Sequence, residues 1–204
     1  VQKLKSGYYD AAYIRGYESA EIGKKSGISL TPYSNTTWAF VLNANKGILS
    51  AASARHAVSL ALSDIDFENY PYLTKAKSLI PPSCTIGTGS YTEAIPDITE
   101  ANNAEKAVEL WKQAVEATSE YNIELTVIAP ENMQNTAKQF LQGIQSSIGS
   151  ISNAEEDRKI SFTLTLETKT EKEIKEAVKS GNYDIAFYPL TATAASPVSF
   201  LQSF

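Results

Sequence analysis

The sequence predicts a mixed α/β fold, in which helices pack on the faces of one β-sheet. Three observations support this. Strand patterns alternate with amphipathic helices, the composition is that of an ordinary globular chain, and no linker rich in glycine, serine or proline divides the 204 residues. Hydrophobic residues make up 43% of the chain and charged residues 20%, which suits a soluble domain with a sizeable core. We expect residues 1–204 to form a single α/β domain.

The N-terminal part is predicted to hold three strands and one helix. Residues 8–14, 28–33 and 36–43 are rich in aromatic and β-branched side chains, which favour strands. Residues 16–26 have helical composition, and Gly27 follows them as a helix stop.

Three amphipathic helices are predicted in the middle of the chain, at residues 51–63, 103–118 and 132–148. In each of them apolar residues recur three and four positions apart, which places them on one face. We expect Trp111 to lie in the core and the third helix to end at Gly149.

The C-terminal half alternates strand and helix most regularly. Strands are predicted at residues 123–129, 160–166 and 183–188. The segment Thr170–Glu173 is a capping box that opens the helix before the last of these strands, and Gly181 ends that helix.

One short segment occurs twice. Residues 5–13 and 179–187 agree at seven of nine positions, counting Tyr13 and Phe187 as a match. The second copy is predicted to be a helix end, a glycine stop and the start of a strand. We therefore expect one local structure used at two points of one sheet, because two distant copies do not make a solenoid repeat.

Charge and composition argue against several classes of function. The net charge of −5 disfavours a nucleic-acid binder, which needs a basic face to neutralise phosphates. No segment approaches the roughly 20 apolar residues of a membrane-spanning helix. Cys84 is the only cysteine, so the chain cannot form an internal disulfide.

Catalytic chemistry has little support in the sequence. Cys84 and His56 are the only candidate pair of thiol nucleophile and base, and His56 lies within a helical segment. One histidine and one cysteine cannot form a zinc tetrad without acidic ligands. The segment Gly87–Ser90 is predicted to be a loop, and it lacks the lysine and the following helix of a phosphate-binding loop. We predict that the protein is not an enzyme and holds no metal or cofactor.

Aromatic residues are abundant, with two Trp, eleven Tyr and seven Phe. Trp38 and Tyr188 lie near the ends of predicted strands, close to Tyr33 and Pro189 respectively. Ligands of open α/β sheets bind at the carboxyl ends of the strands, where aromatic side chains suit a cleft. These residues are therefore candidates for a binding site, and packing at the rim of the sheet is an equal alternative.

Several short segments, taken together and in order, resemble one family. They are Asn43 with the helix Ser50–Leu62, Ile80-Pro81-Pro82, the segment Ala104–Leu110, the strand Ile123–Val127 with the helix Phe140–Gly149, Ser180–Ala186, and Ser199-Phe200-Leu201. These segments are similar to motifs of the extracellular solute-binding proteins of peptide and nickel ABC importers, the oligopeptide-binding-protein family (family 5). The resemblance covers nearly the whole chain.

The resemblance implies that residues 1–204 are most of the second large lobe of a two-lobed, periplasmic-binding-protein-like (type II) fold. The chain begins within what reads as a helix tail, and Ser196-Pro197 opens a new helix just before Phe204, so we expect an excised piece of a longer protein. In the family, a peptide or other small solute is trapped between the lobes and delivered to an ABC transporter permease. The implied location is extracellular or periplasmic, with lipoprotein anchoring of the full-length protein.

The sequence departs from the family where peptide importers bind a free amino terminus. Alignment on Pro197 and Phe200 places Leu190 at the family's tryptophan and Thr193 at its amine-binding aspartate. A neutral threonine loses a charge-assisted hydrogen bond of roughly 1.5–3 kcal/mol. The resemblance thus implies the fold without implying recognition of a free amine.

Five residues form the predicted wall of the solute site. They are Tyr33, Trp38, Tyr188, Leu190 and Thr193. Two other interpretations remain open. The chain could be a ligand-sensing module of a regulator that uses the same fold, or a small enzyme that uses Cys84 and His56.

Overall fold

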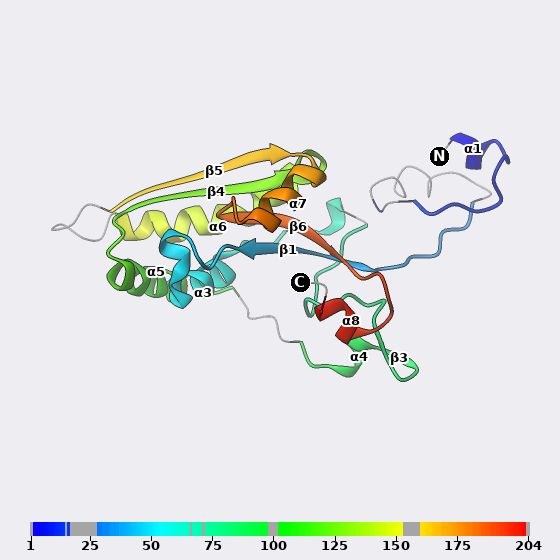
Figure 1. Ribbon diagram of the computed structural model, residues 1–204, viewed down its shortest axis with the longest axis horizontal. Helices are drawn as coiled ribbons and strands as arrows, with labels where there is room; N and C mark the ends of the chain where they lie inside the picture. The colour runs from blue at the N-terminus through cyan, green and yellow to red at the C-terminus, as the bar shows by residue number, and fades with distance from the viewer. Residues whose placement is uncertain are drawn as a thin grey trace.

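A four-stranded mixed sheet forms the centre of the computed structural model, which describes residues 2–14, 16, 28–65, 67–70, 72–97, 102–152 and 160–202. The strand order is β1-β6-β4-β5, with β1 at Thr36–Leu42, β4 at Asn122–Pro130, β5 at Ser161–Lys169 and β6 at Ile185–Thr191. Strand β4 is parallel to β5 and β6, whereas β1 is antiparallel to β6. With helices on its faces (Figure 1), this sheet confirms the predicted fold class.

The helices divide between the two faces of the sheet. Helices α3 (Ala52–Ala61), α5 (Ala104–Thr118) and α6 (Gln134–Ser152) lie on one face, and α7 (Glu171–Ser180) lies on the other (Figure 1). The largest apolar core lies on the first face, and Trp111 of α5 is completely buried in it. Both the helix and the core position of Trp111 are as predicted.

The capping box predicted before α7 is present. The Thr170 hydroxyl oxygen accepts the N–H of Glu173 at 3.3 Å, and the Glu173 carboxylate accepts the N–H of Thr170 at 2.8 Å. The Thr170 hydroxyl also donates to that carboxylate at 2.7 Å. This bond, followed by the one from the Thr170 N–H, holds the pKa of the Glu173 carboxyl below its usual value. The helix ends where predicted, at Gly181.

The repeated segment encodes a helix end. Gly7 and Gly181 both take left-handed backbone conformations, with φ of 72° and 71°. After each glycine, the next N–H donates to the carbonyl oxygen five residues earlier at 2.9 Å, which is the Schellman pattern. The strand expected after the first copy, at residues 8–14, is wrong, because the structure assigns no strand there. The two copies share a cap and not a position in the sheet.

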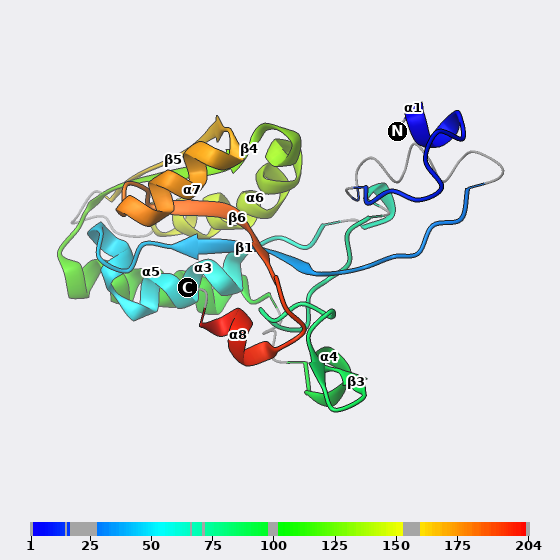
Figure 2. The same cartoon turned by 45° about the vertical axis from the view of Figure 1, so that its right-hand side comes forward.

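Residues 28–33 are likewise not a strand, and this prediction is also wrong. Aromatic and β-branched side chains favour strands only where a neighbouring strand pairs with the backbone, and among the described residues neither segment has one. The segment before β1 extends away from the sheet (Figure 2), and Tyr8 and Tyr13 are 71% and 75% exposed. Apart from Gly16, the helix predicted at 16–26 lies outside the described residues.

Helix α6 continues past its predicted end. Gly149 was expected to stop it, but the helix extends to Ser152. Ile148 and Ile151, on either side of the glycine, are both completely buried in the main core. Their packing supports another turn of helix despite the low helix propensity of glycine.

A smaller unit lies beside the sheet, where α4, β3 and α8 gather (Figure 2). It contains the hairpin of β2 (Thr85–Ile86) and β3 (Gly89–Ser90), with α4 (Tyr91–Ala94) and α8 (Pro197–Leu201). The predicted loop at Gly87–Ser90 is therefore partly the second strand of this hairpin. Its apolar cluster consists of Ile80, Cys84, Leu190, Ala192 and Phe200. Other short helices of the described ranges are α1 (Gln2–Lys5), η1 (Gly47–Ser50), η2 (Phe67–Asn69) and η3 (Glu131–Met133).

Polar side chains join β1, β4 and β6 at one corner of the sheet. The Asn43 amide donates to the carbonyl oxygens of Gly181 and Tyr183, each at 2.9 Å. The Asp184 carboxylate accepts the N–H of Thr126 at 2.8 Å and forms an ion pair with Lys46 at 2.7 Å. The backbone pairing between β4 and β6 is short, and these side-chain interactions strengthen the contact between the two strands.

A second carboxylate lies near this corner and gives a testable pH dependence. Burial, followed by the negative charge of Asp184, raises the pKa of Glu120, although the N–H of Ile48 donates to it. A raised pKa in the folded state means that protonation of Glu120 stabilises the fold at low pH. That contribution is complete below the pKa of Glu120 in the unfolded chain, and it is lost as the pH rises through the pKa in the folded protein.

Glu120→Gln is therefore expected to raise stability at pH 7, because glutamine removes the charge and keeps an oxygen to accept from Ile48. Partly exposed charge interactions suggest a gain of about 0.2–1 kcal/mol. Urea denaturation at pH 7 and below pH 4 measures it, and the gain should vanish at the lower pH. An unchanged gain at both pH values would show that charge is not its cause.

Candidate functional site

A cavity of about 850 Å³ opens beside the ribbon formed by β1 and β6. It lies within the range of roughly 300–1,000 Å³ typical of small-molecule sites. Asn132 and Met133 after β4, Glu171 after β5 and Thr191 at the end of β6 all line it. The cavity therefore lies at the carboxyl ends of the three parallel strands.

The topology explains why a cavity forms here. Helix α6 follows β4 on one face of the sheet, and α7 follows β5 on the other (Figure 1). When the connections after two neighbouring strands run to opposite faces of the sheet, a crevice opens at the carboxyl ends of those strands. Ligands of open α/β sheets bind in such a crevice.

The register of β1 and β6 determines which side chains face the cavity. Directly opposed residues of antiparallel strands share a face of the sheet, and the face alternates along the strand. Three successive pairs on one face line the cavity, namely Thr36 with Thr191, Trp38 with Pro189, and Phe40 with Phe187. Thr37 and Ala39 also border it from β1, whereas their β6 partners, Leu190 and Tyr188, are not part of the described lining. The lining thus changes from hydroxyl to aromatic groups along the ribbon.

The aromatic part of the lining is closely packed. The Phe187 ring stacks on Phe40 at 4.7 Å between centroids and lies 5.3 Å from the Trp38 ring. Phe140 of α6 packs edge-on against Phe40 at 5.8 Å. Phe187 is only 2% exposed, whereas Trp38 is half-buried. Trp38 therefore lies at one end of the stack. Like Phe40 and Phe140, which are also half-buried and line the cavity, it has surface left for a ligand.

The polar side chains that the ribbon of β1 and β6 contributes to the lining are neutral. The hydroxyl oxygens of Thr36 and Thr191 lie 3.0 Å apart and share a hydrogen bond. The Thr36 hydroxyl is also within hydrogen-bond distance of the Asn35 side-chain oxygen, at 3.1 Å. Such groups suit the amide N–H and carbonyl groups of a peptide backbone.

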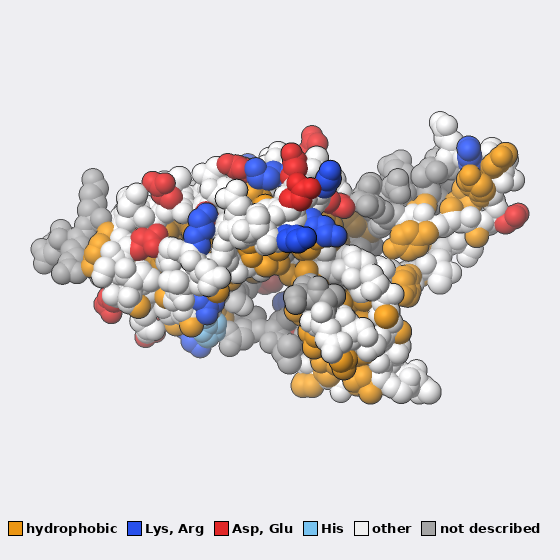
Figure 3. Space-filling model, in the orientation of Figure 1, with side chains coloured by type: hydrophobic (Ala, Val, Ile, Leu, Met, Phe, Trp, Pro, Cys, Tyr) orange, Lys and Arg blue, Asp and Glu red, His pale blue; other side chains and the backbone are white. Residues whose placement is uncertain are grey.

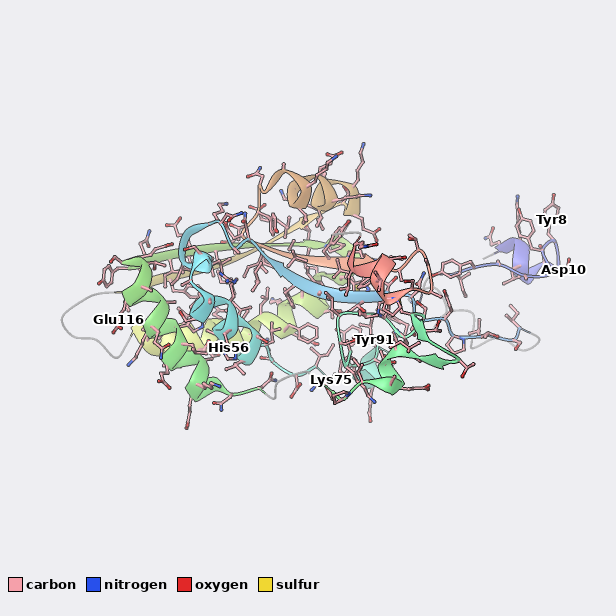
Figure 4. The ribbon with its side chains drawn as sticks, turned by 60° about the horizontal axis from the view of Figure 1, so that its bottom comes forward. Tyr8, Asp10, His56, Lys75, Tyr91 and Glu116 are labelled. Atoms are coloured by element: carbon pink, nitrogen blue, oxygen red, sulfur yellow. The ribbon has the colours of Figure 1, made fainter. Side chains whose placement is uncertain are left out.

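The charged groups of the described lining balance in number. They are Asp64, Lys75, Lys77 and Glu171. Asp64 and Lys75 pair at 3.7 Å, and the side chains of both are mostly exposed. Figure 4 shows Lys75 on one of the segments that surround the cavity. No group of three or more potential metal-ligating side chains occurs within the described ranges.

The structure separates the five predicted site residues. Tyr33 and Trp38 line the cavity. Tyr188 and Leu190 pair with Ala39 and Thr37 on the opposite face of the ribbon, where Leu190 is buried with Cys84 and Phe200. There, burial and the charge of Glu171 raise the pKa of Tyr188.

Thr193, the remaining predicted residue, follows the end of β6, is exposed and is not part of the described lining. Sequence reasoning missed Phe40, Phe187, Pro189 and Thr191. Alternation of side chains along the strands could have found them. Trp38 pairs with Pro189, so once this register is known, every second residue of β6 on either side of Pro189 shares the face of Trp38.

Cys84 and His56 are not brought together at this site, because the described lining contains neither of them. The Cys84 thiol is buried 3.9 Å from the carbonyl oxygen of Ala194, and burial raises its pKa, which disfavours a nucleophilic thiolate. The backbone carbonyl oxygen of Cys84 accepts the N–H of Tyr91, so Tyr91 marks the position of Cys84. Figure 4 shows Tyr91 apart from His56 of α3.

Comparisons with known proteins identify the family of the chain and show related folds. The model of the family "Bacterial extracellular solute-binding proteins, family 5 Middle" matches residues 1–204. A search of curated proteins found no match. Solved structures with a similar fold include the substrate-binding domain of an oligopeptide ABC transporter from Bacillus anthracis str. Ames, with a TM-score of 0.70 and 15% identity over 98% of this chain.

Two further similar structures are described as peptide complexes. OppA from Listeria monocytogenes, bound to peptide, has a TM-score of 0.65 and 16% identity over 98% of this chain. DppA from Helicobacter pylori, in complex with the peptide STSA, has a TM-score of 0.60 and 19% identity over the whole chain. This chain spans 39%, 39% and 36% of the B. anthracis, L. monocytogenes and H. pylori chains, respectively.

Proposed function

The chain belongs to family 5 of the bacterial extracellular solute-binding proteins, and we propose that it forms one wall of a cleft that captures a peptide or similar small solute for an ABC transporter permease. The observation that carries this proposal is the cavity at the carboxyl ends of β4, β5 and β6, with an aromatic stack at one end and hydroxyl groups at the other. Two structural neighbours that bind peptides support the peptide as the solute.

In this proposal Tyr33 and Trp38 contact the solute directly, together with Pro189 and Thr191 of β6. Tyr188 and Leu190 act from the opposite face of the ribbon, where they hold β6 in place against the smaller unit. Thr193 is neutral, so the proposal assigns no ion pair to a free amino terminus there. The peptide is held through its backbone and side chains.

The other wall of the cleft would come from a first lobe outside these residues. The N-terminal segment supports this part of the proposal, because Tyr8, Tyr13 and Tyr33 expose large rings that a neighbouring lobe would cover. Figure 3 shows hydrophobic side chains along this projecting segment. In the described ranges no helix has the length and apolar character needed to cross a bilayer. Anchoring of the full-length protein as a lipoprotein, at an extracellular or periplasmic location, is part of the proposal.

Native mass spectrometry of the full-length protein, purified without refolding, tests the function. We expect a series of peptide masses released from the protein, and fewer of them from a Trp38→Ala variant because its aromatic contact is lost. A single non-peptide mass would keep solute capture but overturn the peptide assignment. An empty protein that also fails to bind a mixed peptide pool by calorimetry would overturn the proposal.

A further inference from the structure

We propose that the cavity selects peptides that carry an aromatic or large aliphatic side chain, which packs on the exposed part of the Trp38 ring. This inference rests on the proposed function and names the class of solute for that site. It follows from the order in which groups line the ribbon of β1 and β6.

The Trp38 ring is held in place before any solute arrives. On one side it lies against Phe187, which is 2% exposed and is itself stacked on Phe40. Across the ribbon, Trp38 is paired with Pro189, whose ring restricts the backbone of β6. A fixed aromatic surface binds a second apolar group at a low entropic cost, because little freedom is lost on binding.

The side chains around Trp38 extend the apolar surface. Ile65, Leu73 and Met133 all line the cavity, and Leu73 and Met133 belong to the same apolar cluster as Phe187. Ile65 and Met133 are buried, at 8% and 3% exposed, so of the three it is the half-buried Leu73 that has surface for a solute side chain. This end of the cavity therefore accepts both aromatic and branched aliphatic side chains.

Acidic side chains are disfavoured at the same place. The charged groups of the described lining come from other segments than the ribbon, and Asp64 and Lys75 already pair with each other. A carboxylate on the Trp38 ring would lose its hydration and meet the negative face of the ring, whereas a cation would be attracted to that face. The hydroxyl groups of Thr36 and Thr191 are placed along the ribbon to meet the peptide backbone instead.

Calorimetry of the full-length protein with four pentapeptides tests this inference. Each peptide is alanine except at its central residue, which is Phe, Leu, Ala or Glu. We expect the Phe and Leu peptides to bind about tenfold or more tightly than the Ala peptide, and the Glu peptide to bind more weakly than the Ala peptide. These peptides are alanine outside the central residue, so they can bind at different positions along the cleft. The central side chain can therefore reach the Trp38 ring.

Three variants separate the inference from a general loss of binding. Trp38→Ala should bring the Phe peptide close to the affinity of the Ala peptide, whereas Trp38→Phe should keep most of the preference. Phe162→Ala removes a ring from β5, at the far edge of the same sheet and outside the described lining, and should leave the preference unchanged. Circular dichroism checks that all three variants are folded.

The outcomes are distinct. Equal affinities for the Phe and Ala peptides, or a Trp38→Ala variant that weakens both equally, would overturn the inference while peptide capture stands. Tightest binding of the Glu peptide would overturn it in the same way. Absence of binding by all four peptides and by the mixed peptide pool would overturn the proposed function and this inference together.

Discussion

Gly143→Ala is expected to destabilise the protein, although alanine is the best helix former. A Cβ atom at this position of α6 would lie 1.9 Å from the carbonyl oxygen of Ala61 and 2.8 Å from the Ser63 hydroxyl oxygen. The first of these atoms belongs to the backbone at the end of α3, so it cannot turn away as a side chain would. The two segments are also tied by the N–H of Ser63, which donates to the carbonyl oxygen of Phe140 at 3.0 Å.

Replacing glycine by alanine inside a helix stabilises the folded state by about 1 kcal/mol, whereas forcing two packed backbones apart destabilises it by about 1–3 kcal/mol or more. We expect a net loss of about 2 kcal/mol, measured by urea denaturation of the purified protein. Phe140 and Leu62, which neighbour this contact, line the cavity, so weaker binding of the solute should accompany the loss.

Gly149→Ala is the matched control, since it makes the same change in the same helix. A Cβ atom at residue 149 would meet nothing within 4 Å, so only the propensity acts. We expect a gain of about 0.5–1 kcal/mol. Opposite signs for the two variants would support the close contact between α6 and the end of α3. A stabilised Gly143→Ala variant would show that the contact is absent.

Trp111→Ala is expected to have the largest effect of any single truncation in the core. Trp111 is the largest of the completely buried side chains in the described residues, and it projects from α5 into the main apolar core. Removing such a ring costs about 3–5 kcal/mol, because the burial is lost and a cavity is left. That is a large part of the 5–15 kcal/mol that keeps a typical protein folded.

Trp111→Phe distinguishes packing from hydrogen bonding at the same position. Among the described residues, the indole N–H of Trp111 has no hydrogen-bond partner. Phenylalanine therefore removes volume without breaking a hydrogen bond, and we expect a loss of only about 1–2 kcal/mol. Thermal and urea denaturation measure both variants. A loss for Trp111→Phe well above this range would indicate that the N–H is bonded in solution.

Much of the fold could be predicted from the sequence, because many of its signals are local. Apolar residues spaced three and four apart gave α3, α5 and α6, and the capping box of Thr170 and Glu173 gave the start of α7. Each of these signals acts within one or two turns of chain and does not depend on what lies beside it. The ordered motifs, for the same reason, were enough to indicate the family.

The strands at residues 8–14 and 28–33 failed because a strand needs a partner, which local composition cannot supply. The two glycines of α6 show a related limit. Gly149 was expected to end the helix, yet it lies inside it, whereas Gly143 makes the close contact with Ala61. Only the position of α3 in space distinguishes their roles.

The sequence alone determined that aromatic residues gather near the ends of β1 and β6, and it named Trp38 and Tyr33 among them. The tertiary structure decided which face of the ribbon each residue occupies. The strand β6 is apolar at nearly every position because elements pack on both of its faces, so alternation of polar and apolar residues cannot tell the faces apart. Side chains change face at every residue, and the register of β6 against β1 therefore placed Phe187 and Pro189 in the cavity and Tyr188 and Leu190 behind it.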